Sequence, residues 1–199
     1  MYLTKLPITS TKRAYLLAPE RLILRHSWIS DSLRQVNSRP KRYLWRLETA
    51  TKEPQLLLLS QTKPNQQVLS RFGEIENLKT STYQIDLYLK QDYAFTLVAN
   101  PTKRNNQTHK VMQLTKKAEQ LNWLKQKAQT AGFILKQVKL TNATMVTLKH
   151  NQQRPTKLQS VTFTGILQIT DLTAFKYALT HGLGREKAYG FGLLTIKAV

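Results

Sequence analysis

Cysteine, acidic residues and long apolar runs are what this sequence lacks. It has no cysteine, which excludes disulfide bonds, thiolate nucleophiles and cysteine zinc sites. Only 11 of its 199 residues are Asp or Glu, and no carboxylate pair or His/Asp/Glu cluster stands at the spacing of metal ligands. We therefore expect no metal and no other cofactor. Any chemistry must use His, Lys, Arg, Tyr or isolated carboxylates.

Export and membrane-spanning segments are also missing. The longest aliphatic run is Leu56 to Leu59, and the opening Met1-Tyr2-Leu3-Thr4 alternates without the apolar core of a signal peptide. These features predict a soluble protein with no membrane association, located in the cytoplasm if the host is bacterial.

The charge is strongly positive, with 31 Lys and Arg giving a formal net charge of +20. So large an excess destabilises an isolated fold by self-repulsion, and it is typical of a protein that neutralises phosphates. The alternatives are a generic solvated surface, or binding to a membrane surface through a long amphipathic helix. The charge favours a nucleic acid as the partner.

The periodicity of apolar residues predicts two successive β-α-β-β-α-β units. In the first half we expect a strand at 2–8, a helix at 19–35, strands at 43–48 and 55–60, a short helix at 66–72 and a strand at 83–89. In the second half we expect a strand at 93–99, a polar loop at 102–110, a helix from Thr115 to Gly132, two strands or one long bent strand over 133–150, a strand at 161–169, a helix capped by Asp171 and a strand at 190–197.

These elements predict an α+β fold class with tandem ferredoxin-like (RRM-like) βαββαβ domains. The N-terminal domain is expected at 1–90 and the C-terminal domain at 91–199. Gly165 interrupts a predicted strand, which suggests a bulge, a close backbone approach or a plain packing tolerance. Trp28, Trp45 and Trp123 are expected in the core rather than as platforms for bases.

A glycine-rich segment at 181–192 holds four of the seven glycines. Glycine permits positive φ and leaves backbone amides open to a ligand. The segment is not a Walker loop or a dinucleotide fingerprint, because it lacks the Gly-Lys-Ser/Thr ending and precedes a strand. It is either a phosphate cradle or a helix cap followed by an ordinary turn. The candidate RNA contacts in it are Gly182, Gly184, Arg185, Lys187 and Gly190.

His26 stands apart from the other three histidines as a candidate for catalysis. It lies on the apolar stripe of the first predicted helix with Ile29 and Leu33. An imidazole pKa near the operating pH suits proton transfer, and cations nearby favour the neutral form. The alternative is a histidine satisfied at the edge of the core.

Basic residues outside the glycine-rich segment supply further candidate contacts. A hairpin loop projects far enough to enter or straddle an RNA groove, which favours the residues near 149–157. The candidates are Arg25, Arg34, Lys103, Arg104, Lys149, Arg154 and Lys157. A basic site without a metal limits nuclease chemistry to attack by the 2′-hydroxyl of RNA, which needs a base, an acid and cations. RNA is therefore the favoured substrate, because DNA lacks that hydroxyl.

Several ordered segments match one known family along nearly the whole chain. They are Met1-Tyr2-Leu3, His26, Leu44-Trp-Arg-Leu-Glu48, Ser60 with Pro64, Phe95-Thr-Leu-Val-Ala-Asn-Pro-Thr102, Trp123-Leu124, Gly132-Phe133, Val161 to Leu167 with Asp171, and Gly182 to Leu194. On these segments the chain resembles the CasE-type CRISPR repeat-RNA endoribonucleases of the RAMP superfamily, which are subunits of the type I-E Cascade complex.

The resemblance implies a metal-independent endoribonuclease that binds the stem-loop of a CRISPR repeat transcript. It implies that His26 is the catalytic base or acid and that the RNA is cut at the 3′ base of the stem, leaving a 2′,3′-cyclic phosphate. The protein is then expected to be a monomer when free and to stay bound to its product with the other Cascade subunits. A non-catalytic scaffold of the same fold that binds structured RNA is the alternative function.

One position departs from the family pattern. The family often has a tyrosine three residues before the histidine, and here this residue is Ile23. Tyr15 is near in sequence but out of helical register, and Arg25 could stabilise charge without moving a proton. The sequence therefore leaves the second catalytic group unassigned.

Overall fold

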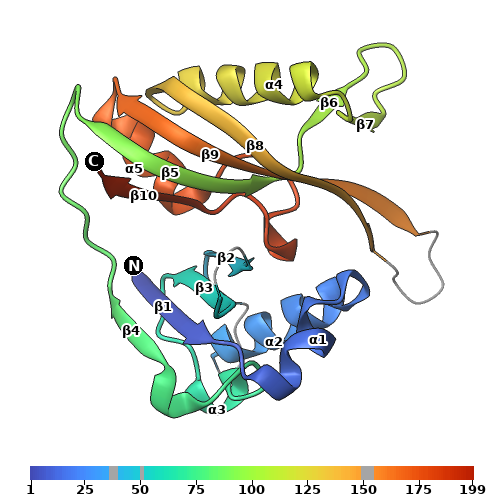
Figure 1. The fold of residues 1–199 in the computed structure, drawn as a ribbon, viewed down its shortest axis with the longest axis vertical. Coiled ribbons are helices and arrows are strands. Elements are labelled where there is room, and N and C mark those ends of the chain that lie inside the picture. The colour runs from blue at the N-terminus through green and yellow to red at the C-terminus, as the bar shows by residue number, and fades with distance from the viewer. Residues whose placement is uncertain (36–39, 50–51, 149–154) are drawn as a thin grey trace. The chain divides into compact units, whose positions relative to one another are not determined.

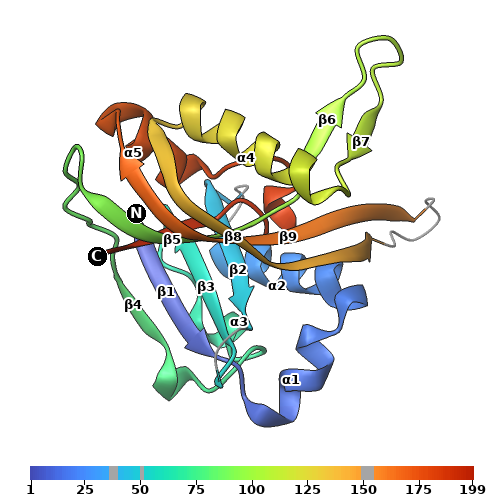
Figure 2. The same ribbon diagram turned by 45° about the horizontal axis from the view of Figure 1, so that its top comes forward.

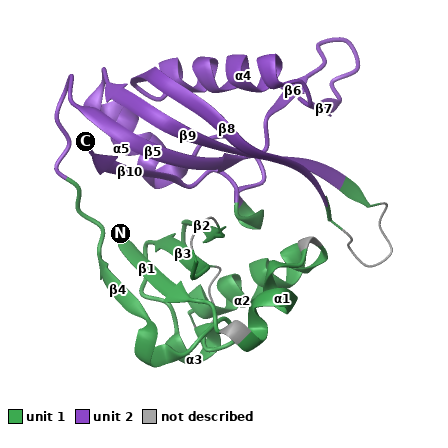
Figure 3. Cartoon of the chain, viewed as in Figure 1, with its two compact units in different colours: residues 1–85, 147–156, 188–190 green, residues 86–146, 157–187, 191–199 purple. Residues whose placement is uncertain are grey.

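The computed structural model describes residues 1–35, 40–49, 52–148 and 155–199. The chain divides into two compact units, coloured separately in Figure 3. The N-terminal unit comprises residues 1–85, 147–156 and 188–190, and the C-terminal unit comprises residues 86–146, 157–187 and 191–199. A short segment from near the end of the chain therefore clusters with the first unit.

The N-terminal unit is a four-stranded antiparallel sheet with helices (Figure 1). Its strands are β1 (Tyr2–Pro7), β2 (Tyr43–Glu48), β3 (Gln55–Ser60) and β4 (Lys79–Thr82). Its helices are α1 (Ser10–Leu17), α2 (Leu22–Leu33) and α3 (Gln66–Leu69), with 3-10 turns η1 (Pro19–Arg21) and η2 (Ile75–Asn77). The strand order is β2-β3-β1-β4. Fully buried Leu6, Ile29, Leu58 and Phe72 contribute to its core.

The C-terminal unit repeats this arrangement. Its main elements are β5 (Asp92–Ala99), α4 (Lys117–Thr130), β8 (Phe133–Leu148), β9 (Thr156–Ile169), α5 (Leu172–His181) and β10 (Leu194–Ala198). The strand order is β10-β5-β9-β8. Read from its other edge, β8-β9-β5-β10, it matches the order β2-β3-β1-β4 of the first sheet strand for strand. The predicted α+β fold of tandem ferredoxin-like domains is therefore confirmed. A single core joins Trp123 and Leu124 of α4, Phe175 of α5, and Phe95 and Phe163 of the sheet.

The ends of α4 and α5 show how far local signals specify helices. Asp171 caps α5 as predicted, its carboxylate accepting from the amides of Thr173 and Ala174. Gly132, which follows α4, has φ +73°, so the predicted left-handed terminator is confirmed. The predicted cap at Thr115 is wrong, because α4 begins after Lys116. No side-chain cap bonds the N-terminal amides of α4. The buried Gln120 side chain donates to the Leu114 carbonyl, 2.9 Å away, which ties the helix to the residue before it.

The closing strand expected at 190–197 begins only at Leu194, and three other predicted elements differ more from the structure. The strand expected at 83–89 is wrong, because β4 ends at Thr82, where its partner β1 runs out at Tyr2. Residues 83–88 therefore alternate between half-buried and exposed side chains without a partner strand. The helix expected at 19–35 is divided into η1 and α2, and α1 before it was not predicted. The segment expected to be a polar loop at 102–110 begins with β6 (Thr102–Arg104), which pairs with β7 (Val111–Gln113) just after it to form a small hairpin, visible in Figure 2.

Gly165 marks a close approach of two backbones. A Cβ atom there would lie 2.0 Å from the carbonyl oxygen of Gln137 on β8. The residues 133–148 form one long strand, one of the two predicted alternatives. Trp45 and Trp123 lie in the core as predicted, at 1% and 6% exposure, whereas Trp28 is only half-buried. No helix in the described ranges is long and apolar enough to span a membrane.

Candidate active site and RNA-binding surface

His26 lies beside two tyrosines in the N-terminal unit. The phenol oxygen of Tyr43 on β2 is 3.3 Å from its Nδ1. The ring of Tyr189, in the 3-10 turn η3 (Lys187–Tyr189), meets the imidazole edge-on at a centroid distance of 5.3 Å. His26 itself is half-buried in α2. Three elements thus bring one imidazole and two phenols together.

The segment carrying Tyr189 is anchored on Trp45. The indole Nε1 donates to the carbonyl oxygen of Ala188, 2.8 Å away. Gly190 has φ +86°, and a Cβ atom there would lie 3.1 Å from the indole ring. Only glycine adopts this backbone conformation without strain in so little space. Gly190 is therefore a glycine because of its packing on Trp45, and this packing holds Tyr189 beside His26.

The Tyr43 phenol is biased toward its neutral form. Burial raises its pKa, and the neighbouring Tyr189 raises it further, while a hydrogen bond with the Ser30 side chain acts in the opposite direction. A neutral phenol at ordinary pH can donate a proton as well as accept a hydrogen bond. In one histidine tautomer Nδ1–H donates to the phenol oxygen, leaving the Nε2 lone pair as a base. In the other, the phenol donates to Nδ1.

Arg25 has a structural role in this fold. It is 6% exposed, and its guanidinium donates to the carbonyl oxygens of Leu16 and Ala18 at the end of α1. Burial lowers its pKa to about 10, opposed by the charge of Glu20. The predicted RNA contact at Arg25 does not fit this position, because the guanidinium is turned into the protein. Arg34, in contrast, has a side chain 64% exposed and a loose ion pair with Asp31 at 3.5 Å.

The glycine-rich segment is shaped by the fold. All four of its glycines have positive φ. Gly184 packs against Trp123, where a Cβ atom would lie 3.0 Å from the indole. The amides of Leu183 and Gly192 donate to carbonyls inside the unit. Gly182 caps α5, and the other three glycines lie in close contact with Trp123, Trp45 or the Leu183 carbonyl. The alternative of a helix cap followed by a turn therefore accounts for much of the glycine content, and amide contacts with phosphate stay a prediction.

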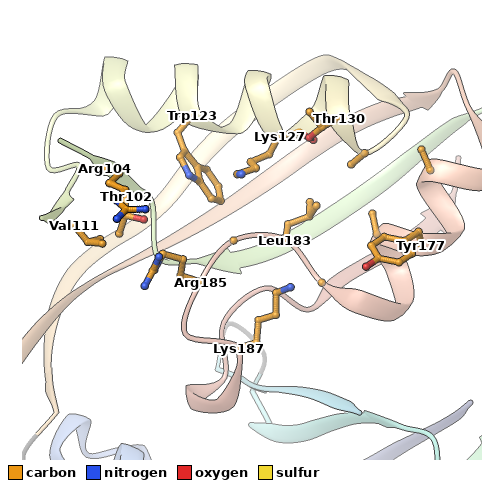
Figure 4. Close-up of a pocket in the computed structure, with 15 residues that line it drawn as sticks. Thr102, Arg104, Val111, Trp123, Lys127, Thr130, Tyr177, Leu183, Arg185 and Lys187 are labelled. Atoms are coloured by element: carbon orange, nitrogen blue, oxygen red, sulfur yellow. The ribbon is translucent and has the colours of Figure 1, made fainter. Parts of the chain in front are cut away.

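A basic cavity lies in the C-terminal unit, between α4, α5 and the glycine-rich segment (Figure 4). Its volume is about 470 Å³. Four cations line it, Arg104, Lys127, Arg185 and Lys187, and none of its described lining residues is Asp or Glu. The Nε of Arg104 donates to the carbonyl oxygen of His109 at 3.3 Å, which orients this side chain on the β6–β7 hairpin. The cavity therefore presents a concave cationic surface to an anionic ligand.

The predicted RNA contacts fall into three groups. The structure brings Arg104, Gly182, Gly184, Arg185 and Lys187 together at the basic cavity. Lys103 pairs with Glu119 at 3.3 Å, and Lys157 is exposed on β9. Lys149 and Arg154 lie outside the described residues. In the described part of the chain, no three His, Asp or Glu side chains form a group that could hold a metal ion.

Sequence reasoning missed Tyr43, Tyr189 and the cavity residues Lys127 and Tyr177. Tyr189 stands inside the glycine-rich segment, and that position was the one signal available. Tyr43 opens an ordinary strand, and no local pattern separates it from the other seven tyrosines.

Three comparisons place the chain among known proteins. It is 29% identical over 210 residues to the CRISPR-associated endoribonuclease Cse3 of Thermus thermophilus, covering 98% of this chain and 99% of that one. The solved structure of Thermus thermophilus Cse3 bound to an RNA representing a pre-cleavage complex superposes with a TM-score of 0.85, at 28% identity over 98% of each chain. Escherichia coli Cas6e shares the fold, with a TM-score of 0.71 at 24% identity over the whole of both chains.

The family model described as CRISPR associated protein matches residues 1–198. This match covers both sheets, the His26 cluster and the glycine-rich segment, and it confirms the resemblance found in the sequence. The protein belongs to the family of CRISPR associated proteins.

Proposed function

We propose that this protein is an endoribonuclease that binds the stem-loop of CRISPR repeat transcripts and cleaves at the 3′ base of the stem. The observation that carries the proposal is the cluster of His26, Tyr43 and Tyr189, which supplies groups for moving a proton on to and off the reacting atoms. The similarity to an endoribonuclease solved with a pre-cleavage RNA supports the substrate class.

The proposed reaction is attack by the RNA's own 2′-hydroxyl. A base takes the proton of the 2′-hydroxyl, and the oxygen bonds to the adjacent phosphorus. The bond to the 5′-oxygen of the next nucleotide breaks, and an acid protonates this leaving oxygen. The products are a 2′,3′-cyclic phosphate and a 5′-hydroxyl end. His26 acts as base or acid, with Tyr43 or Tyr189 as its partner, so the reaction requires no metal ion.

Cations hold the RNA and stabilise the charge that develops on the phosphate. The proposed contacts are Arg34, Lys103, Arg104, Lys149, Arg154, Lys157, Gly182, Gly184, Arg185, Lys187 and Gly190. We further propose that the protein is a monomer when free, keeps the cleaved stem-loop bound and joins the other Cascade subunits in this form. The net charge of +20 supports tight binding to a polyanion.

The test is cleavage of repeat hairpins by the purified protein in EDTA. We expect one cut and a 2′,3′-cyclic phosphate, detected by mass spectrometry, with no product when the attacking hydroxyl is replaced by 2′-deoxy. His26→Ala should slow single-turnover cleavage by about 10²–10⁴-fold while leaving binding within a few-fold. If wild type binds every hairpin tightly and cuts none, the protein is the non-catalytic scaffold instead.

A further inference from the structure

An exposed aromatic stack borders the basic cavity. Tyr177 and His181, one turn apart on α5, stack with ring centroids 3.7 Å apart and planes within 8°. The Nδ1 of His181 has two oxygen neighbours, the Tyr177 carbonyl at 3.1 Å and the Thr180 hydroxyl at 2.9 Å, which fix the imidazole. Tyr177 is nevertheless 63% exposed. One face of the Tyr177 ring packs on His181, and most of the rest of the side chain is exposed to solvent. Core packing does not explain such a tyrosine.

Cations surround the same cavity. Figure 4 shows Lys127 on α4 and Tyr177 on α5 lining it together, with Arg185 on the segment between α5 and β10. Thr102 and Thr130 add hydroxyl groups. A nucleotide has an aromatic base and an anionic phosphate, and proteins bind single strands by pairing aromatic side chains with a cationic groove. The cavity offers both kinds of group at once.

The size of the cavity limits what it can hold. A volume of about 470 Å³ lies in the range of pockets for small ligands. It accommodates a nucleotide or two, whereas a paired stem is too wide to enter and can only lie across its mouth. The aromatic stack would then have no base to meet, because the bases of a stem are paired and stacked on one another.

We propose that this cavity binds an unpaired nucleotide that flanks the stem of the RNA substrate, with its base on Tyr177 and its phosphate on Lys127. The proposal rests on the proposed function and extends recognition from the stem-loop to the single strand beside it.

The test compares three RNAs: the blunt hairpin, the hairpin with an unpaired 5′ tail and the hairpin with an unpaired 3′ tail. Wild type should bind one tailed RNA more tightly than the blunt hairpin. Tyr177→Ala should weaken binding of that tailed RNA by about tenfold. Lys127→Gln should also weaken it and reduce the slope of log K against log salt by about 0.7. Binding of the blunt hairpin should stay unchanged in both variants. This RNA serves for binding alone, because it has no nucleotide beyond the 3′ base of the stem and therefore no bond to cleave.

Two control variants match these changes. Tyr88→Ala removes a tyrosine of the same unit that is 60% exposed and does not line the cavity. Lys125→Gln removes the same charge from the same helix, at an exposed position that does not line the cavity. Both should bind the tailed RNA as wild type does.

The outcomes separate the two proposals. If wild type binds the blunt hairpin and cuts the hairpin with the 3′ tail, but neither tail increases the affinity, the nucleotide site is refuted and the proposed function stands. If Tyr177→Ala weakens binding of the blunt hairpin by the same factor as binding of the tailed hairpin, the cavity contacts the stem and the nucleotide site is again refuted. If no hairpin is bound at all, the proposed function itself fails.

Discussion

The phenol oxygen of Tyr43 lies 3.3 Å from Nδ1 of His26, although the two residues are 17 positions apart in the chain. Ile23, one helical turn before His26 in α2, has no hydroxyl group to offer. Strand β2 supplies a phenol to the same histidine from another direction. The His26 imidazole therefore has a hydroxyl partner that comes from a strand and not from its own helix, α2.

Tyr43→Phe should slow cleavage without weakening RNA binding. The change removes one oxygen and keeps the ring, so the imidazole loses the partner at its Nδ1 while the packing stays. We expect a reduction of about 10–100-fold in the single-turnover rate, at the lower end of acid–base contributions. Tyr15→Phe is the control, because Tyr15 is 45% exposed and its ring stacks under the guanidinium of Arg21. Equal rates for wild type and Tyr43→Phe would remove Tyr43 from the reaction.

Loosening the anchor of Tyr189 should reduce cleavage from a distance. Trp45→Phe keeps an aromatic ring and removes the Nε1–H that holds the Ala188 carbonyl. Gly190→Ala places a Cβ atom against the indole at φ +86° and should cost about 1–3 kcal/mol of stability. In both variants the single-turnover cleavage rate should fall by a larger factor than the affinity, with rate and Kd measured on the same hairpin. Unchanged cleavage in both would show that Tyr189 needs no fixed position.

Arg25 and Arg34 should have opposite effects when substituted. Arg25→Met leaves the carbonyls of Leu16 and Ala18 without their donor, and we expect a loss of about 1–3 kcal/mol in urea unfolding. RNA affinity below the unfolding transition should change little. Arg34→Gln removes an exposed cation and should cost under 1 kcal/mol of stability. It should instead weaken RNA binding and lower its salt dependence. The reverse pattern would assign Arg25 to the RNA surface.

Tyr83 should make stability fall at high pH. Burial raises its pKa to about 12, from about 10 in the unfolded chain. The unfolded chain therefore loses this proton first, so the contribution is complete below pH 10 and is lost as pH rises to about 12. The loss is about 2–3 kcal/mol. The measurement is urea unfolding of wild type and Tyr83→Phe across this window, since the difference between them removes the titration of lysines. A constant difference would contradict the burial of this phenol.

The fold was largely predictable because its signals are local. Burial alternates every second residue in β5, and Asp171 and Gly132 bound their helices by contacts within a few residues. The strand placed at 83–89 failed because alternation cannot show where a partner strand ends. α1 was missed because its apolar content is low and no side chain caps it.

The sequence by itself determined the doubled α+β topology and the basic character of the protein, and it made His26 and the glycine-rich segment candidates for function. The topology and the charge depend on composition and on spacing along the chain, and the two candidates depend also on the resemblance to a known family. Only the tertiary structure decided that Tyr43 and Tyr189 meet His26, that Arg25 is buried and that Tyr177 borders a cationic cavity. These relationships depend on which elements pack together, and contacts between residues distant in sequence leave no periodic trace in it.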